Sequence, residues 1–467
     1  MKNDFPGPQT ESAKHRRANR KCLARGGQGN KVFAMAREQG EHLMAATLKF
    51  IHASDLHLDR PMSGLTEIPT HLYEVLANAP YEAAQKVFDL AVSERVDFVL
   101  LAGDLYDSDL SNARSAAFLL SQFERLADKG ITVYWCGGET DHPDRWPTAI
   151  ELPDNVVTFS SCVVEHVSHE REGQAIARIM GCGYDDKHRR TANDFSTPNS
   201  ELFTIALAHG DFDTQTLKTE NVHYWALGGN HKSSKHDRTS STVVYPGTPQ
   251  GRCPKESGPH GFKLGRIDAA GKLRLQTVES DRVRWLPQKL AISEGVEVHT
   301  LKKELTERAA KIVADTTDQI VLARWTLATE GMFNPAIRKR EWSEQILEWL
   351  RDEFGRGDKG LWSVSLDVAA PKQLPSDWYE EDTILGEFMR AIGRYQSDDS
   401  LRLNLHEYTP TTVEGTLTAS MSQVSQGRRE EILRRAAMVG IDYLAAHKHY
   451  GGDDEEVQLN DQIEAAI

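Results

Sequence analysis

Two apolar runs of strand length in this chain each end in side chains that bind hard metal ions. The first begins at Phe50 and stops at Asp55-Leu56-His57, and the second covers residues 98–102 and stops at Gly103-Asp104. Open α/β sheets bind ligands at the carboxyl ends of their strands, where neighbouring strand ends meet. The pattern therefore predicts a layered sheet structure with a metal site along one edge.

The length of the chain predicts more than one domain. At 467 residues the chain is longer than a single hydrophobic core usually accommodates, so two or three domains are expected. With 39% hydrophobic and 27% charged residues it has the composition of a globular protein, and no apolar stretch is long enough to cross a bilayer. The 5 cysteines form no C-x-x-C pair, which fits a reducing compartment. We therefore expect a cytoplasmic location and no membrane association.

Charge is distributed unevenly along the chain. The 55 Lys and Arg against 69 Asp and Glu give a net charge of −14, but residues 1–46 hold nine basic and four acidic residues, so they carry +5 and the remainder carries −19. We expect residues 1–46 to be a disordered basic tail, or to precede a true start near Met44, with a basic arm for nucleic acid as the alternative. An acidic body binds nucleic acid poorly without local basic patches, so composition does not favour DNA.

Strands and helices alternate from residue 47 to residue 282, which predicts a layered α/β domain. Its helices are expected over residues 81–96 and from an N-cap at Ser111 to a stop at Gly130. Its clearest strands are expected at residues 48–54, 97–102, 131–136, 203–208 and 223–227.

A second, smaller unit is expected over residues 283–370, followed by a helical C-terminal region over residues 371–467. The smaller unit should contain strands at 283–292, 320–327 and 361–368 with helices at 301–314 and 335–354. The C-terminal region contains amphipathic stretches at 384–392 and 428–447 and ends in an acidic segment.

Five chemistry-bearing side chains follow predicted strands in an order that indicates a metal centre. Asp55 and His57 are two residues apart, so they can face one metal, and Asp104 is the natural bridge between two metals. His209 and His231 follow two further predicted strands. Each of these motifs alone is weak evidence for a metal site. Together they supply a bridging carboxylate with mixed His and Asp ligands, which two divalent metals about 3.5–4 Å apart require. Such a pair can clamp a phosphate, lower the pKa of a bound water and stabilise a leaving oxygen.

The motifs together resemble the calcineurin-like metallophosphoesterases. The chain reads Asp-x-His, then Gly-Asp-Leu-Tyr-Asp, then a His-Gly pair, then Tyr-Trp-Ala-Leu-Gly-x-x-His. Within that superfamily it is most similar to the SbcD-type DNA double-strand-break nuclease subunits and the YhaO-like DNA repair exonucleases. In that subgroup the phosphoesterase domain ends with a segment similar to residues 245–252 of this chain. The resemblance implies a four-layer αββα sandwich, a small α/β capping domain and a helical C-terminal extension. It covers residues 48–268 closely and extends more loosely through residue 368.

The resemblance also implies a ligand set, a reaction and partners. Asp55, His57, Asp104 and His231 would hold one metal, and Asp104 with His209 would hold the second. Manganese is the implied metal, although these ligands also suit iron or zinc. The implied reaction is phosphodiester hydrolysis on DNA during repair. The implied partners are DNA, a coiled-coil ATPase of the SbcC type that grips the C-terminal helical region, and a second copy of the chain. Packing of residues 428–447 onto their own chain is the alternative to ATPase docking.

The chain departs from the family pattern after the third strand. The expected Gly-Asn-His-Asp reads Gly138-Glu139-Thr140-Asp141 here, followed by His142. In the gap-free register Glu139 replaces the Asn ligand, and Thr140 replaces the His that helps to protonate the leaving group. A register shifted by two residues makes Asp141 the ligand and His142 the acid. We predict Glu139 as a metal ligand and His142 as the catalytic acid.

A second departure lies in the family's Gly-His-x-His, which here reads Gly228-Gly229-Asn230-His231. Both departures fall on the second metal and the acid, while the set for the first metal is complete. The chain is therefore expected to bind one metal tightly and one weakly, or to be a family member with reduced catalytic activity. Losing a general acid lowers the rate about 10²–10⁴-fold. A hydrolase of small phosphate esters and a non-catalytic repair scaffold are the alternative functions.

Overall fold

The computed structural model describes residues 47–444 apart from short gaps. These gaps fall at 111–112, 197–201, 216, 218–220, 240, 294–295, 317, 329–336, 338–339, 357–359, 370–375, 402 and 404–425. The predicted basic tail, the predicted N-cap at Ser111 and the acidic C-terminal segment lie outside the described residues.

The described chain forms two compact units. The first contains residues 47–61, 78–251 and 259–281, and the second contains residues 62–77, 252–258 and the chain from 282 onward. The segment 62–77 groups with the second unit because His71 hydrogen-bonds the Gly355 carbonyl at 2.9 Å and Glu67 pairs with Arg351 at 2.9 Å. The sequence pattern had grouped both short segments with the first domain.

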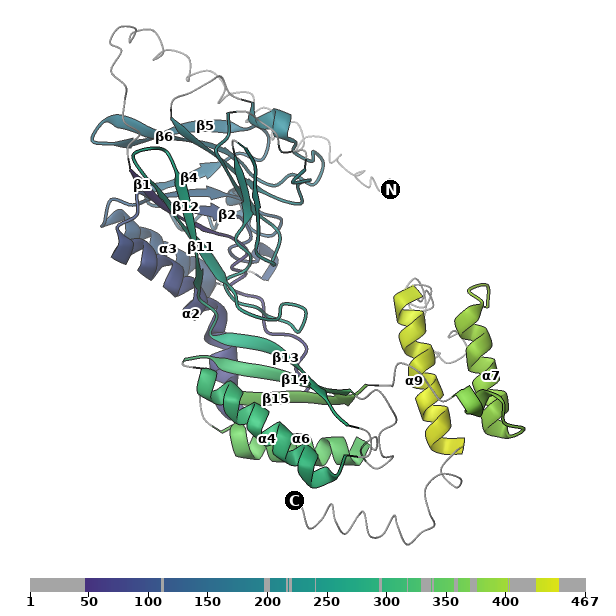
Figure 1. Cartoon of the computed structure of the whole chain (residues 1–467). Coiled ribbons are helices and arrows are strands. Elements are labelled where there is room, and N and C mark those ends of the chain that lie inside the picture. The colour runs from purple at the N-terminus through teal and green to yellow at the C-terminus, as the bar shows by residue number, and fades with distance from the viewer. Residues whose placement is uncertain are drawn as a thin grey trace, which may run out of the picture. The chain divides into compact units, whose positions relative to one another are not determined.

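The first unit is a sandwich of two six-stranded sheets (Figure 1). Sheet A has the order β12-β11-β1-β2-β3-β4, with bounds Leu273–Glu279, Gly261–Ile267, Leu48–Ala53, Phe98–Ala102, Thr132–Cys136 and Val156–Phe159. Sheet B has the order β5-β6-β7-β8-β10-β9, with bounds Glu165–Arg171, Gln174–Cys182, Phe203–His209, Tyr224–Gly228, Thr242–Tyr245 and Ser234–Asp237.

Apolar side chains fill the space between the sheets, among them Phe50 and Phe98 from sheet A and Tyr224 from sheet B. Helices α2 (Thr70–Glu94) and α3 (Ala113–Ala127) cover the other face of sheet A. On the other face of sheet B the described cover is the 3₁₀ turn η3 (Ala192–Phe195) and loop residues packed around buried Trp225. The expected α/β sandwich is confirmed. In the described residues, its outer layer on sheet B is a turn and loops rather than an α-helix.

Parallel pairing brings the chemistry-bearing loops to one edge of each sheet. Strands β1, β2 and β3 are parallel neighbours, with Ala53 opposite Leu101 and Ala102 opposite Cys136. Strands β7 and β8 are also parallel, with His209 opposite Gly228. Because the strands of each group end together, the residues that follow them meet there.

In the second unit, a parallel three-stranded sheet and two helices form a small α/β module. The strands are β13 (Val283–Ala291), β14 (Ile320–Ala328) and β15 (Gly360–Val368), and the helices are α4 (Val298–Asp315) and α6 (Arg340–Phe354). Trp325 is fully buried in its core, and its indole N–H donates to the Ser363 hydroxyl at 2.9 Å. The predicted order of strands and helices is observed.

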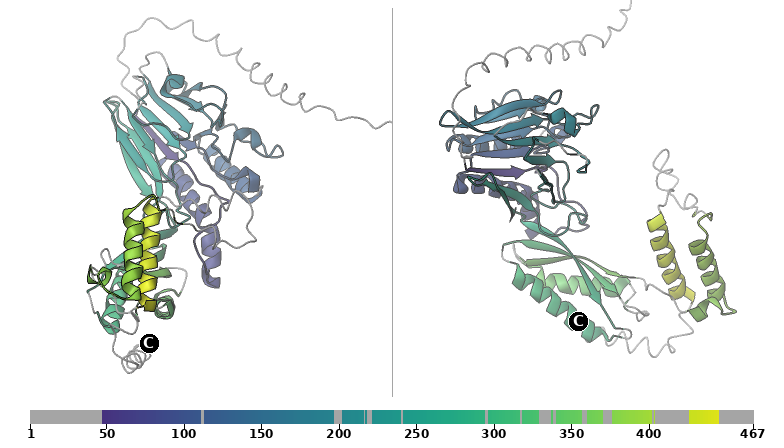
Figure 2. Two further views of the ribbon diagram at one scale, coloured as in Figure 1. Left: turned by 90° about the vertical axis from the view of Figure 1, so that its right-hand side faces the viewer. Right: turned by 45° about the horizontal axis from the view of Figure 1, so that its top comes forward.

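A pair of helices follows, α7 (Ile384–Ser397) and α9 (Gln426–Leu444), preceded by the 3₁₀ turn η4 (Ser376–Tyr379). The two helices lie side by side (Figure 2) and bury Met389, Leu433 and Ala437 between them. Within the part of the chain that the structure describes, no helix is long and apolar enough to span a membrane.

Candidate metal centre

Three of the predicted ligands have a strained backbone. Asp55, His57 and Asp104 adopt φ angles of 56°, 41° and 57°, in the left-handed region that non-glycine residues rarely occupy. Backbone hydrogen bonds hold them there, because the Asp55 N–H donates to the Gly103 carbonyl and the His57 N–H to the Asp104 carbonyl, each at 2.9 Å. Such conformations cost about 1–3 kcal/mol each and concentrate at functional sites.

The side chains that follow four strands converge on one small volume. His57 Nε2 lies 3.5 Å from Asp104 Oδ2, and His209 Nε2 lies 3.7 Å from the same oxygen. His231 Nε2 lies 3.2 Å from His57 Nε2 and 3.9 Å from Asp55 Oδ1. Two groups of three have ligand atoms within 4.8 Å of one another, namely Asp55 with His57 and His231, and Asp55 with Asp104 and His209. Asp55 belongs to both groups.

The ring of His209 is oriented to offer one nitrogen to this volume. Its Nδ1 lies 2.8 Å from the Ala102 carbonyl, which can only accept, so Nδ1 carries the proton and Nε2 presents a lone pair toward Asp104. Burial opposes protonation of His209, but the nearby Asp104 and Asp55 carboxylates outweigh it and raise its pKa. Burial also raises the pKa of Asp55. Buried carboxylates and imidazoles aimed at one point suit a divalent cation.

Asp104 is held so that one oxygen faces the cluster. The backbone N–H and the hydroxyl of Thr140 both donate to Oδ1, at 2.9 and 3.0 Å. Oδ2 therefore remains for His57 and His209. Thr140 therefore holds the orientation of the Asp104 carboxylate.

Asp141 stabilises the same loop from inside. Its carboxylate accepts from the N–H groups of Asp104 and Leu105 at 2.8 Å, from Gly138 at 2.6 Å, and from the Trp135 indole at 3.1 Å. The residue is fully buried, and burial, together with the charge of Asp104, raises its pKa to about 7. Since both oxygens already have two donors, Asp141 is a poor metal ligand, which argues against that part of the shifted register.

Comparison with known proteins agrees with this arrangement. The family model for the calcineurin-like phosphoesterases matches residues 48–174. The metallophosphoesterase YhaO of Bacillus subtilis, described as uncharacterized, is 30% identical over 380 residues, which cover 77% of this chain and 90% of that protein. The chain belongs to the calcineurin-like metallophosphoesterases.

Weaker similarity links this metallophosphoesterase to DNA double-strand break repair proteins named Mre11. The protein from Saccharolobus solfataricus is 24% identical over 111 residues, which cover 24% of this chain and 26% of that protein. The protein from Haloferax volcanii is 25% identical over 232 residues, which cover 46% of this chain and 51% of that protein. This chain therefore spans about half or less of these two relatives' lengths.

The structure does not bring two of the predicted site residues into the cluster. Glu139 is exposed and belongs to neither of the ligand groups found among the described residues. The His142 ring accepts from the Asp144 N–H at 3.2 Å and lies 2.9 Å from the Ser161 hydroxyl, and it also stands outside both groups. Glu139 as a ligand and His142 as an acid stay predictions.

Gly229 has a role that its residue type does not reveal. Its N–H donates to both oxygens of Asp55, at 3.2 and 3.1 Å, and its φ of 97° suits glycine. A Cβ at this position would lie 3.2 Å from His209 Nε2. A side chain at 229 would therefore start beside the His209 ring, and this metallophosphoesterase places only a backbone donor there.

Gly228 allows strand β8 to approach β2 closely, and this leads to a stability prediction. A Cβ at 228 would lie 1.7 Å from the Ala102 carbonyl oxygen, so Gly228→Ala must displace backbone. We expect it to lower the free energy of unfolding by about 1–3 kcal/mol in urea titrations. Gly183→Ala is the matched control, because its nearest new contacts would be ordinary ones at 3.5 Å. Equal losses for the two variants would contradict the close-approach argument.

Proposed function

We propose that this metallophosphoesterase hydrolyses phosphodiester bonds in DNA, with an exonuclease-like role in DNA repair. Phosphoester hydrolysis itself follows from the family. The observation that carries the proposal is the convergence of two carboxylates and three imidazoles from four strand ends on one volume. The choice of DNA is supported by the similarity to the two Mre11 proteins.

The family uses a dimetal site, and the donor set here fits one. Asp55, His57, Asp104 and His231 would hold the first metal, and Asp104 with His209 would hold the second. We propose manganese, while the mixed His and carboxylate set also suits iron or zinc. When bound, such a pair lowers the pKa of water and neutralises charge that develops on phosphate. Thr140 and Gly229 hold the Asp104 and Asp55 carboxylates in place for that purpose.

The two metals are expected to bind unequally. Four side chains are proposed for the first metal, whereas Glu139 is exposed and position 229 has no side chain. We expect purified protein, desalted into metal-free buffer, to retain about one equivalent of metal per chain by elemental analysis, with a second binding only in excess Mn²⁺. Two retained equivalents would contradict this and would indicate that Glu139 or a neighbour completes the second site.

His142 is the proposed proton donor to the leaving oxygen, and its test depends on the leaving group. A p-nitrophenolate departs without an acid, but a sugar oxygen does not. We therefore expect His142→Ala to lower turnover of unactivated DNA about 10²–10⁴-fold while p-nitrophenyl diester turnover changes little. Ser161→Ala is a useful companion, since it removes the hydroxyl beside Nε2 and keeps the imidazole. Equal effects of His142→Ala on both substrates would contradict the acid role.

The substrate proposal is tested with two phosphodiesters in the presence of Mn²⁺. Turnover of both bis(p-nitrophenyl) phosphate and linear duplex DNA, lost in Asp104→Asn, would support the nuclease. Turnover of the small ester alone would favour a small-molecule phosphoesterase. A weakened or non-catalytic repair subunit is favoured by Thr140 and Gly229, which stand where the family has histidines, and turnover of neither substrate would support it.

We also propose a cytoplasmic location and two protein partners. Helices α7 and α9 carry exposed apolar side chains, Ile384 at 73%, Val439 at 56% and Tyr443 at 82% exposure, which suit docking to a coiled coil of an SbcC-type ATPase. A homodimer is the second partner proposal. Both are tested by co-purification and by the mass of the native assembly in light scattering.

A further inference from the structure

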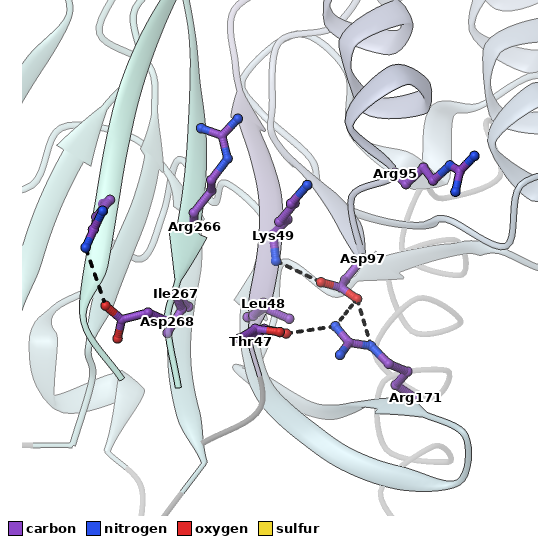
Figure 3. Close-up of a pocket in the computed structure, with 10 residues that line it drawn as sticks. Thr47, Leu48, Lys49, Arg95, Asp97, Arg171, Arg266, Ile267 and Asp268 are labelled. Carbon is purple, nitrogen blue, oxygen red and sulfur yellow. Dashed lines mark hydrogen bonds and ion pairs between the residues drawn. The ribbon is translucent and has the colours of Figure 1, made fainter. Parts of the chain in front are cut away.

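A charged cavity lies at the end of β1 opposite the metal centre. It has a volume of about 570 Å³ and is lined by Thr47, Leu48 and Lys49 at the start of that strand (Figure 3). Asp55 follows the other end of β1, and six residues of strand span about 20 Å. The cavity is therefore separate from the candidate catalytic site. Its size falls within the range of small-ligand pockets.

The residues around the cavity have a positive net charge, although the net charge of the chain is negative. Its lining contains five basic residues, Lys49, Arg95, Arg171, Arg266 and Arg274. Two carboxylates, Asp97 and Asp268, also line it, and Glu94 pairs with both Lys49 and Arg266. Five positive charges against three negative ones leave a surplus of two, in a chain whose net charge is −14.

Several of these cations are held in place by their neighbours. Arg171 pairs with Asp97 and also donates to the Thr47 carbonyl at 2.9 Å. Arg266 pairs with Glu94 at 3.0 Å. Guanidinium groups fixed in this way present planar donors at low entropic cost, and that geometry matches the oxygens of phosphate.

Arg95 differs from the others in both its backbone and its surroundings. It follows the last residue of α2, where the Arg95 N–H donates to Val92 and the Val96 N–H donates to Ala91, which is the hydrogen-bond pattern of a Schellman cap. Its φ of 50° is left-handed, and glycine is the usual residue at this position. The side chain is exposed, and in the described structure no ion pair or hydrogen bond engages its guanidinium (Figure 3). An exposed arginine at a strained position, whose guanidinium has no partner among the described residues, is available to an external anion.

We propose that this cavity binds phosphate groups of a nucleic-acid strand, with Arg95 in direct contact with the strand. A strand is favoured over a single small anion because residues 1–46, which precede Thr47 in the sequence, carry a net charge of +5, and Thr47 lines the cavity. Additional positive charge favours a polyanion over a single small anion. The inference rests on the DNA part of the proposed function but not on hydrolysis.

The test is binding of a fluorescein-labelled single-stranded 20-mer, followed by anisotropy over a series of salt concentrations, with EDTA present to prevent cleavage. Arg95→Gly should weaken binding about 3–10-fold at low salt and reduce the slope of log affinity against log salt by about 0.7–0.9. Glycine relieves the left-handed backbone, so the melting temperature of this variant should be unchanged or higher. Lys129→Gln, which removes one exposed charge elsewhere in the first unit, should leave the slope unchanged.

Several outcomes would overturn the inference. They are absence of binding by the wild-type chain, an Arg95→Gly slope equal to that of the wild type, and an equal loss in Lys129→Gln. Competition by adenosine monophosphate at equal phosphate concentration would also overturn it, because the ligand would then be a free small phosphate. Turnover of bis(p-nitrophenyl) phosphate is measured in parallel. Weaker DNA binding by Arg95→Gly without wild-type turnover supports this site and rejects the hydrolase, whereas turnover without any DNA binding rejects this site and favours a small ester.

Discussion

Asp104→Asn is expected to lower phosphodiester turnover about 10³-fold and to remove bound metal. The Thr140 N–H and hydroxyl both donate to Oδ1, so an asparagine must place its carbonyl oxygen there. Its NH₂ group then occupies the position of Oδ2, facing His57 Nε2 and His209 Nε2. A neutral donor would then replace the anionic ligand that we propose is common to both metals. Metal stabilisation is worth several kcal/mol in the transition state, and each 1.36 kcal/mol is tenfold in rate.

The measurement pairs turnover of bis(p-nitrophenyl) phosphate in Mn²⁺ with metal content by elemental analysis. Asp109→Asn is the matched control, because it makes the same chemical change in the same loop on a side chain that is 89% exposed. We expect the control to stay within about twofold of wild-type activity. Asp104→Asn with more than a tenth of wild-type turnover, or with unchanged metal content, would show that this carboxylate does not bridge the metals.

Most of the fold could be predicted because its strands are short, apolar and buried on both faces. Strand β2 is fully buried along its length, which is why residues 98–102 read as an interior strand. The start of α2 was placed too late. Pro80 resembles a helix boundary, but the helix runs from Thr70 with the proline inside it.

The candidate ligands could be predicted because they follow parallel strands, whose ends must meet. Nothing local to His231 indicates that its Nε2 lies 3.2 Å from that of His57, 174 residues away. Their proximity was predicted only from the shared edge of the sheets and from the resemblance to the family. The strained φ angles of Asp55, His57 and Asp104 are a further signal, but they are visible only in the structure.

Backbone donors explain what the sequence could not reveal. Gly229 reads as a lost histidine, yet its N–H binds the Asp55 carboxylate, and a residue type does not report where its amide points. The role of Asp141 could not be predicted either, because its hydrogen-bond partners Asp104 and Leu105 lie 37 and 36 residues away in the sequence. The residue types alone allowed Asp141 to be a metal ligand, and the four donors around it argue against that assignment.

Asp141→Ala should give the largest loss of stability at this edge of the sheet. The substitution leaves buried N–H groups of Asp104, Leu105 and Gly138 without an acceptor, as well as the Trp135 indole. Each unsatisfied buried donor costs about 1–3 kcal/mol, and relaxation of the loop recovers part of the sum. We therefore expect the free energy of unfolding to fall by about 4 kcal/mol, seen as a lower urea midpoint with an unchanged slope.

Two further variants show whether that loss comes from the hydrogen bonds. Asp141→Asn keeps the shape and can still accept from two donors through its oxygen, but its NH₂ group faces the other two, so we expect about half the loss. Asp128→Ala, at an exposed position near the end of α3, should change stability by less than about 0.5 kcal/mol. Folded Asp141→Asn should also bind metal about 10–100-fold more weakly, because Asp104 loses the carboxylate that holds its backbone. If Asp141→Ala stays within about 1 kcal/mol of wild type, these four bonds do not hold the loop, and the support for Asp104 must lie with Thr140 and with the N–H of His57.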